Sequence, residues 1–535
     1  MKHYFKKLIF LALMLCMTAA VWSGSVTEAQ AAGKIPISSA KDFMKIEENP
    51  SGSYYLTKDI TLPKDMQTLL PYDMLGKAPK FTGTLDGRGH KLKGYTYHGK
   101  GNGEYQSVGI FGAAKDATFK NLTLTGVDIR VNSGEDGALV CTLVSNASHC
   151  KFYKVKISGN ITVTGKCTSN KGARYEVNGL AGSAYGSSFT SCTSSLKIKV
   201  STKMAHTLLV SGLTESCSET MKNCSFSGSI WAGAKAAYES GVTYKGYIAA
   251  GLAKDLSGKV AGCVNSGDIT LKVDKGSTDE GGVSNKIGAY GIGGGEAYDM
   301  SSCGNSGNIK VYAPKMKTDL RTFGLTEVAR GSEGSKKSMT KCWNTGNVSV
   351  TGAKIVFAAG LCESTSVIDQ CYNKGNVSAK GARTREGNET RVGGLCILLS
   401  QMNNCYNVGK VSLDGSGYVG GLASWLDMWD GDVTCNYSTG TVSNTHGDGF
   451  AAALFPHYEG VESYMKNKCM VYDNYYSGSK RGCGLGDNPD PSVKTNAKSI
   501  KISSATSGSC PKLSSKYWTY SSKYKRLILK NNKEK

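Results

Sequence analysis

The sequence is poor in several residues and motifs that would mark a familiar class of protein. Only 10 of its 535 residues are Pro, whereas 67 are Gly, so Gly, Asn and Ser must form most of the turns. No two Cys are spaced as Cys-x-x-Cys and the 7 His are dispersed, which argues against a zinc site. The motif His-Glu-x-x-His is absent, which excludes the metallopeptidases that depend on it. We therefore expect neither a metal nor another cofactor.

Long apolar runs are confined to the start of the chain. Three lysines precede an apolar run over residues 8–21, and Ala29-Gln30-Ala31 fits a small-x-small cleavage site. Residues 1–31 are therefore predicted to be a secretory signal peptide. The run is short for a membrane span, and no Leu-Pro-x-Thr-Gly wall anchor with an apolar tail occurs. We expect a secreted, extracellular protein, either free or associated with the cell surface, with no membrane insertion.

Positive charge exceeds negative charge by a wide margin. Lys and Arg number 64 against 42 Asp and Glu, a net charge of +22 that becomes about +20 without residues 1–31. A basic exported chain can bind host or microbial glycans or anionic cell-wall polymers, although the excess can also serve solubility alone. Nucleic acid is not expected, because no binding module is recognisable. We expect a monomer.

A repeated phrase organises the chain. Cys-x-Asn-x-Gly begins at Cys263, Cys303, Cys342, Cys371 and Cys405, and a displaced copy follows at Cys435. Each Gly is followed by a short run rich in Val and Ile, and each copy is preceded by a Gly-apolar strand such as Gly394-Leu395. A period of 29 to 40 residues with three short strands, and almost no helical periodicity, predicts an all-β parallel β-helix. Eleven Gly-apolar strands indicate about 11 rungs, a rung being one turn of the β-helix.

The repeat assigns a structural role to its own residues. Alternation places Cys in the core, Asn in a ladder of hydrogen bonds along the axis, and Gly at a bend. Because the spacing of the Cys follows the repeat, we expect the 17 Cys outside residues 1–31 to be mostly free, buried thiols. Disulfides between Cys362 and Cys371 and between Cys396 and Cys405 remain the alternative.

The two ends differ from the repeats. Residues 32–107 are predicted to form an N-terminal cap with first strands, including a short helix after Ser39. The repeats then cover residues 108–460. Residues 461–535 are predicted to hold a terminal rung near Met470 and an irregular C-terminal cap, with a frayed tail over 530–535.

Several of these segments resemble one family. The Gly-Leu strands, the phrase Cys-Tyr-Asn-x-Gly-x-Val and the segment Phe81–Gly94 look like the GLUG-repeat surface proteins of anaerobic Gram-positive gut bacteria. The tail over 517–527 is similar to the end of such arrays, although Lys525 stands where Pro is usual. The resemblance covers about residues 38–530. It implies a right-handed parallel β-helix that serves as a stalk or an adhesin-like module.

Aromatic residues follow Cys in three consecutive repeats. They are Trp343, Tyr372 and Tyr406. If the Cys point inward, these side chains point outward about one rung apart and could stack on sugar rings. The alternative is a column of rings that stack on one another and stabilise the sheet.

The most unusual segment lies where the repeat breaks. Counted from Leu422 and Leu454, residues of one rung align with those of the next, so that two carboxylates come together beside aromatic rings. The predicted ligand-binding residues here are Trp425, Asp427, Trp429, Asp430, His457 and Tyr458, and the predicted carboxylate pair is Asp427 and Glu459. Two such carboxylates are what glycoside hydrolysis requires. The alternative is an insertion that packs its rings against the β-helix.

Three functions follow as hypotheses. The leading one is a secreted or cell-surface β-helix that displays a lateral surface for adhesion or glycan binding, without catalysis. The second is a polysaccharide-degrading enzyme, of hydrolase or lyase type, that uses the region from Trp425 to Glu459. The third is a purely structural stalk.

Overall fold

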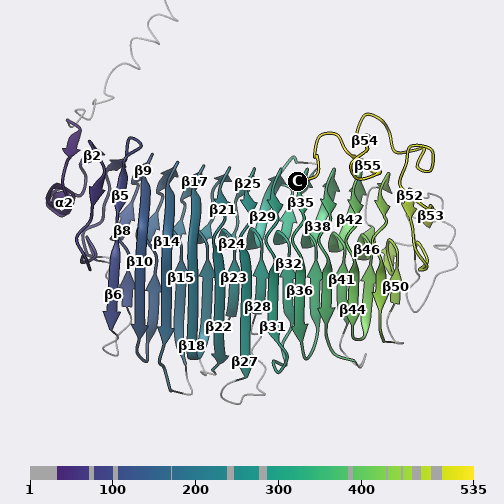
Figure 1. The fold of residues 1–535 in the computed structure, drawn as a ribbon, viewed down its shortest axis with the longest axis horizontal. Coiled ribbons are helices and arrows are strands. Elements are labelled where there is room, and N and C mark those ends of the chain that lie inside the picture. Colours follow the sequence, from purple (N-terminus) through teal and green to yellow (C-terminus); the bar gives the residue numbers. More distant parts are fainter. Residues whose placement is uncertain are drawn as a thin grey trace, which may run out of the picture.

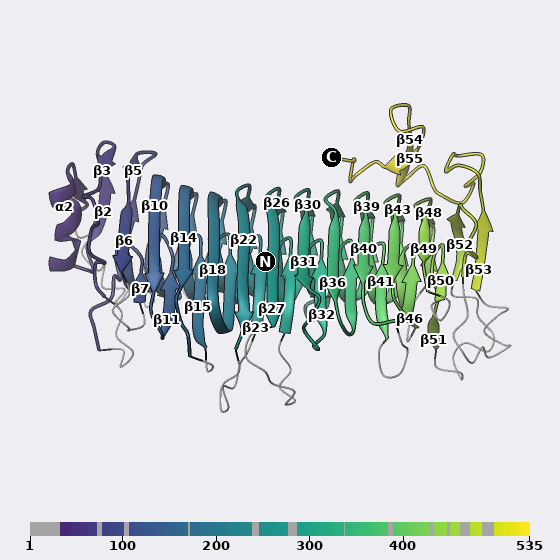
Figure 2. The same cartoon turned by 60° about the horizontal axis from the view of Figure 1, so that its bottom comes forward.

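The computed structural model describes residues 33–71, 77–100, 106–169, 172–237, 246–275, 286–335, 337–383, 389–428, 432–446, 450–460, 471–483 and 497–535. Nearly all of its strands belong to one 53-stranded sheet, in which each strand pairs in parallel with its equivalents one turn before and after. The chain is therefore a parallel β-helix, as predicted, and Figures 1 and 2 show it as an elongated stack of rungs. Parallel pairing begins already at β1 (Ile35–Ile37), which pairs with β2 (Ser53–Leu56).

One lateral surface, here called the post-glycine face, is built by the strands that follow the Gly of each repeat or its equivalent. They are β10 (Thr123–Ser133), β14 (Lys156–Gly165), β18 (Thr193–Ser211), β22 (Ser229–Ala236), β27 (Asp268–Lys275), β31 (Ile309–Ala313), β36 (Val348–Gly352), β40 (Val377–Lys380), β44 (Val411–Asp414) and β49 (Val442–Asn444). Their Val and Ile side chains alternate into the core, and the residues between them point outward.

A second region, here called the Gly-Leu corner, lies where the chain turns at each Gly-Leu pair. The strands that enter it include β28 (Lys286–Tyr290), β32 (Leu320–Phe323), β37 (Val356–Ala359), β41 (Thr390–Gly393), β45 (Gly417–Gly420) and β50 (Phe450–Ala452). Those that leave it include β33 (Thr326–Arg330), β38 (Cys362–Asp369), β42 (Cys396–Asn403), β46 (Ala423–Met428) and β51 (Tyr458–Gly460). The Leu of each pair is fully buried, which ties every rung to the core.

The repeated Cys form a column in the core. Each is buried, and its sulfur forms hydrogen bonds with neighbouring backbone groups. The amide N–H of Cys342 donates to Cys371 Sγ at 3.2 Å, and the amide N–H of Cys371 donates to Cys405 Sγ at 3.3 Å. Asn436 continues the column, because its Oδ1 accepts from Cys405 N at 2.8 Å. The displaced last copy therefore puts Asn436 at the Cys position and turns Cys435 outward.

The predicted Asn ladder is present. The strands β26 (Val264–Asn265), β30 (Gly304–Asn305), β35 (Trp343–Asn344), β39 (Tyr372–Asn373) and β43 (Tyr406–Asn407) stack their Asn side chains in line. The Nδ2 groups of the first four donate to the Oδ1 of the next Asn at 2.6 to 2.8 Å, and all five donate to the carbonyl of the Gly two residues later. These amides are fully buried, so the ladder satisfies groups that would otherwise lack partners.

The bend lies elsewhere than predicted. The left-handed backbone falls on the residue immediately before each Cys or its equivalent, as at Lys341 (φ 53°) and Gln370 (φ 54°), and not at the Asn or Gly that follows. The Gly of the repeat is required for a different reason. A Cβ on Gly346 would lie 1.9 Å from the carbonyl oxygen of Gly307, so only Gly allows adjacent rungs to approach this closely.

The N-terminal end is closed by the predicted helix. In α2 (Ala40–Met44) the hydroxyl of Ser39 accepts from Asp42 N at 3.1 Å, which caps the first turn. Phe43 and Ile46, the latter in the 3₁₀ turn η1 (Lys45–Glu48), are fully buried against the first rungs. The segment covers the open apolar end that any solenoid exposes.

The C-terminal end departs from the prediction. The expected terminal rung is present as β52 (Val471–Tyr476), which pairs with β48 (Tyr437–Ser438), and β53 (Ala497–Lys501) adds one more strand. The hairpin of β54 (Trp518–Ser521) and β55 (Arg526–Leu529), however, does not cover this end. It lies along the side of the β-helix, and the chain runs back to end above the middle rungs (Figures 1 and 2).

None of the sixteen Cys in the described part of the chain forms a disulfide, and neither predicted disulfide pair is bridged. Cys362 contacts Cys396 of the next rung, with the sulfurs 3.6 Å apart, because stacking brings equivalent positions together. Burial raises the pKa of Cys141 to about 12 and that of Cys150 to about 11, so both stay protonated at neutral pH.

Thiol labelling should follow this burial. We expect iodoacetamide to modify the half-buried Cys435 and Cys483 first in the native protein, and to leave the core column unmodified. In denaturant every Cys should react, and mass spectrometry of peptides from the two conditions measures the difference. Rapid native labelling of the core column, or peptides joined by disulfides, would contradict the arrangement.

Candidate functional site

The region that sequence counting singled out does come together. Strands β46 and β51 pair so that Asp427 lies opposite Glu459 in register, as counted from the two Leu. The rings of Trp425 and His457 lie with their centroids 3.6 Å apart. Trp429 and Asp430 lie outside the described residues. Only the backbones of Tyr458 and Glu459 are described.

The indole of Trp425 is half-buried and is contacted by three other side chains. The guanidinium of Arg391 lies 4.0 Å from its centroid, and the ring of Tyr418 meets it edge-on at 5.4 Å. Arg391, His457 and Tyr418 together leave only part of the indole open to solvent. Tyr418 also stacks on Phe450 at 5.4 Å. This arrangement favours packing of the aromatic residues against the Gly-Leu corner over an open platform for a ligand.

The aromatic residues that follow Cys point outward from the core column, but they are not exposed. Tyr372 and Tyr406 are fully buried and Trp343 is 6% exposed. The rings stack in series, with centroids 5.1 Å apart between Tyr372 and Tyr406 and 4.9 Å apart between Tyr406 and Tyr437. The self-stacking alternative therefore describes this column, and the expected exposed strip is corrected.

The C-terminal segment covers this aromatic column. Trp518 packs against Tyr406 and Tyr437, with centroids 5.8 and 5.4 Å apart. The side chain of Glu534 is fully buried, and its Oε1 lies 2.7 Å from both the Tyr406 hydroxyl and Arg526 Nη2. The tail over 530–535 is thus anchored rather than frayed.

The Gly-Leu corner also holds partly buried charges. Arg321 Nε lies 3.0 Å from Glu363 Oε2 and 3.9 Å from Glu327 Oε1, and Lys286 also pairs with Glu327. Burial raises the pKa of Glu363, and the neighbouring Arg321 lowers it in part. Each carboxylate has a cation beside it, which is the arrangement that stabilises buried charge in a packed corner.

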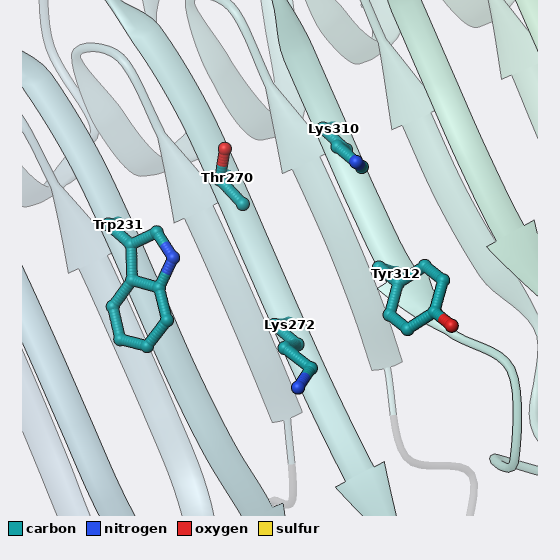
Figure 3. A pocket seen from close by; sticks show the side chains of 5 residues that line it. All are labelled: Trp231, Thr270, Lys272, Lys310 and Tyr312. Atoms are coloured by element: carbon teal, nitrogen blue, oxygen red, sulfur yellow. The ribbon is translucent and has the colours of Figure 1, made fainter.

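An open aromatic surface lies on the post-glycine face. Trp231 of β22 and Tyr312 of β31 are each 38% exposed, and Trp231 is the most exposed Trp in the described part of the chain. Together with Thr270, Lys272 and Lys310 they line an open pocket, and Figure 3 shows both rings nearly face-on from outside.

The indole of Trp231 lies across a glycine of its own strand. A Cβ built on Gly233 would be 2.6 Å from Cη2 of Trp231, so the ring occupies the space above Gly233 and turns its other face to solvent. Lys199, one rung earlier, has its Nζ 5.9 Å from the ring centroid. A flat ring with a lysine beside it can hold a sugar ring and a charge together.

Register places these residues in two outward columns. The first, the Trp231 column, consists of Arg130, Thr162, Lys199, Trp231, Thr270, Lys310, Ser349, Ser378, Ser412 and Ser443. The second, the Tyr312 column, consists of Asn132, Thr164, Ser201, Gly233, Lys272, Tyr312, Thr351, Lys380 and Asp414. The Trp231 column contains no acidic residue, and the Tyr312 column has one, at its far end.

Sequence reasoning missed this surface because it followed the Cys-x-Asn-x-Gly phrase. Trp231 belongs to a rung without that phrase, and Tyr312 stands alone among Lys residues. A usable signal existed: both occupy outward positions of the Val- and Ile-rich strands, where polar residues are the rule. Their proximity depends on the register of three rungs, and that register is not readable from residues about 80 apart.

Known proteins provide no match. No protein-family model, no curated protein and no solved structure matches this chain.

Within the described ranges, no group of His, Cys, Asp and Glu is arranged to hold a metal ion. No helix among the residues placed by the structure has the length and apolar character to cross a lipid bilayer.

Proposed function

We propose that this protein is an exported, non-enzymatic β-helix that binds a glycan on its post-glycine face, at Trp231 and Tyr312. The observation that supports it is the pair of exposed, outward-turned rings on rungs two apart in a rigid sheet. Strands are about 4.8 Å apart, so the two rings are about 10 Å apart along the axis, close to the length of two linked sugar rings.

Rigid presentation favours binding on this surface. The backbone of each strand is fixed by pairing on both sides, so little conformational freedom is lost when a ligand stacks on the rings. Trp425 is half-buried between Arg391 and His457, and the Tyr372 column is covered, so neither is as open as Trp231. The hypothesis of an enzyme at Asp427 and Glu459 rests on backbone register alone.

A glycan array tests the proposal. The wild-type chain should bind a subset of glycans, and Trp231→Ala should weaken that binding by about fivefold, since stacking on one aromatic ring contributes about 1 kcal/mol. Tyr153→Ala is the matched control, because Tyr153 is 40% exposed on another surface, and it should bind as the wild type does. Equal loss in both variants, or no loss in Trp231→Ala, would contradict the proposal.

Variants in the second region distinguish the enzyme hypothesis from glycan binding at the Trp231 surface. Trp425→Ala and Asp427→Ala should leave array binding unchanged if the Trp231 surface is the site. Release of reducing ends from a bound polysaccharide, abolished by Asp427→Ala, would instead support the enzyme.

A further inference from the structure

We infer that the ligand of the Trp231 surface is an acidic polysaccharide whose chain runs along the axis of the β-helix. This inference rests on the proposed function, because it names the ligand of the same surface. It concerns two features that stacking alone does not specify, the charge of the ligand and its direction.

The charge follows from the lysines that accompany the rings. Lys199 and Lys310 stand in the same column as Trp231, one rung before it and two rungs after it. Neither forms an ion pair with any residue in the described part of the chain. Two solvated ammonium groups beside a sugar-stacking ring are complementary to carboxylate or sulfate groups on that sugar chain.

The direction follows from where acidic residues lie. Along the strand β27, Thr270 and Lys272 are flanked by Asp268 on one side and Asp274 on the other. An anionic chain that followed the strand would meet both carboxylates. Along the axis, the Trp231 column presents no carboxylate over ten rungs. At β27, the central strand of the pocket, an anionic chain along the axis therefore avoids two carboxylates that a chain along the strand would meet.

The spacing suits a polymer with regularly placed charges. Lys199 and Lys310 are three rungs apart, which is about 14 Å, and Trp231 lies between them. Beyond Lys310 the column continues as Ser349, Ser378 and Ser412, whose hydroxyl groups can donate to further sugar oxygens. A long chain can thus make the same kind of contact on several rungs.

The aromatic ring of Trp231 distinguishes an acidic polysaccharide from other polyanions as a ligand. A polyphosphate carries charge but no ring. It would therefore contact the lysines without stacking on Trp231. A single-stranded nucleic acid offers bases for stacking and phosphates for Lys, and it is the competing polymer. The predicted export signal and the absence of a recognisable nucleic-acid module favour the polysaccharide.

Binding of the full chain to defined polymers tests the inference. The probes are polygalacturonate for carboxylates, heparin for sulfates, a neutral β-glucan, polyphosphate and an oligothymidylate, each measured by biolayer interferometry at low and high salt. We expect at least one acidic polysaccharide to bind more tightly than all other probes, and salt to weaken it. Whichever of polygalacturonate and heparin binds more tightly identifies the acidic group.

Two sets of variants locate the contact. Lys199→Gln with Lys310→Gln should weaken acidic-polysaccharide binding about tenfold, whereas Lys151→Gln with Lys222→Gln, which removes the same charge from exposed lysines on another surface, should not. Gly233→Ala should also weaken binding, because the added methyl displaces the indole of Trp231 without touching a lysine. Circular dichroism confirms that each variant is folded.

The outcomes distinguish the inference from the function on which it rests. Trp231-dependent binding of the neutral glucan, unaffected by salt and by the Lys199 and Lys310 changes, would overturn the inference and leave glycan binding in place. Preference for polyphosphate or the oligothymidylate would overturn both. Binding of no polymer, or equal loss in the Lys151 and Lys222 control, would likewise contradict both.

Discussion

Replacing Glu534 with Ala should release the C-terminal segment and lower the free energy of unfolding of the rungs beneath it by about 3–5 kcal/mol. The carboxylate is fully buried between Arg526 Nη2 at 2.7 Å and Lys374 Nζ at 3.1 Å, and it also accepts from the Tyr406 hydroxyl. Removing it leaves two cations facing each other in a poorly hydrated site. The cost is therefore that of unpaired buried charge and not of a surface ion pair.

Release of the segment should also uncover the aromatic column. Tyr372, Tyr406 and Tyr437 have no exposed surface while Trp518 and its neighbours cover them. We expect the Glu534→Ala protein to bind a hydrophobic dye, to unfold at a lower temperature, and to be cut by protease within residues 503–535. Lys533→Ala, a change at an exposed side chain in the same tail, is the control. Unchanged thermal stability and no dye binding would show that the segment is held by other contacts.

Replacing Asn344 with Ala should lower the free energy of unfolding by about 3 kcal/mol, since it breaks the middle of the buried ladder. Its Nδ2 donates to Gly346 O at 2.8 Å and to Asn373 Oδ1 at 2.7 Å, and its Oδ1 accepts from Asn305 Nδ2 at 2.7 Å. Each of these partners is buried, so water cannot replace the lost bond.

The same rung supplies a matched control for the ladder. Asn347 belongs to a second series in which it is bonded to Asn308 and Asn376, but its side chain is exposed. Asn347→Ala should change the free energy of unfolding by only about 0.5 kcal/mol, because water satisfies its neighbours. Urea unfolding of the two variants measures the difference. Equal effects at both positions would show that burial does not decide the strength of the ladder.

The repeat made much of the fold predictable from local pattern. Cys263 and its equivalents were placed in the core, the Asn two residues later in an axial ladder, and Ser39 at a helix cap, and the structure confirms each. These features depend on neighbours in the sequence and on the period, which repeats the same environment in every rung. The bend was placed wrongly, because a close approach between rungs and a positive φ are two separate reasons for a Gly. The coordinates show that Gly346 is required for the first reason alone.

The site was less predictable, for a physical reason. Counting from Leu422 and Leu454 correctly aligned Asp427 with Glu459, since both lie at the same distance from a repeated residue. Counting could not reveal that Arg391, from an earlier rung, covers Trp425, or that a segment about 160 residues downstream covers Tyr372. Those contacts depend on how distant segments pack in three dimensions and not on the period of the repeat.

The sequence by itself determined the parallel β-helix, its core columns and its buried Asn ladder, because a repeat dictates the environment of each of its positions. The tertiary structure alone decided which outward side chains remain open to a ligand. The C-terminal hairpin removed the Tyr372 column from solvent, and the register of three rungs brought Trp231, Lys310 and Tyr312 onto one surface. Exposure depends on what lies on top of a side chain, and a repeat carries no information about that.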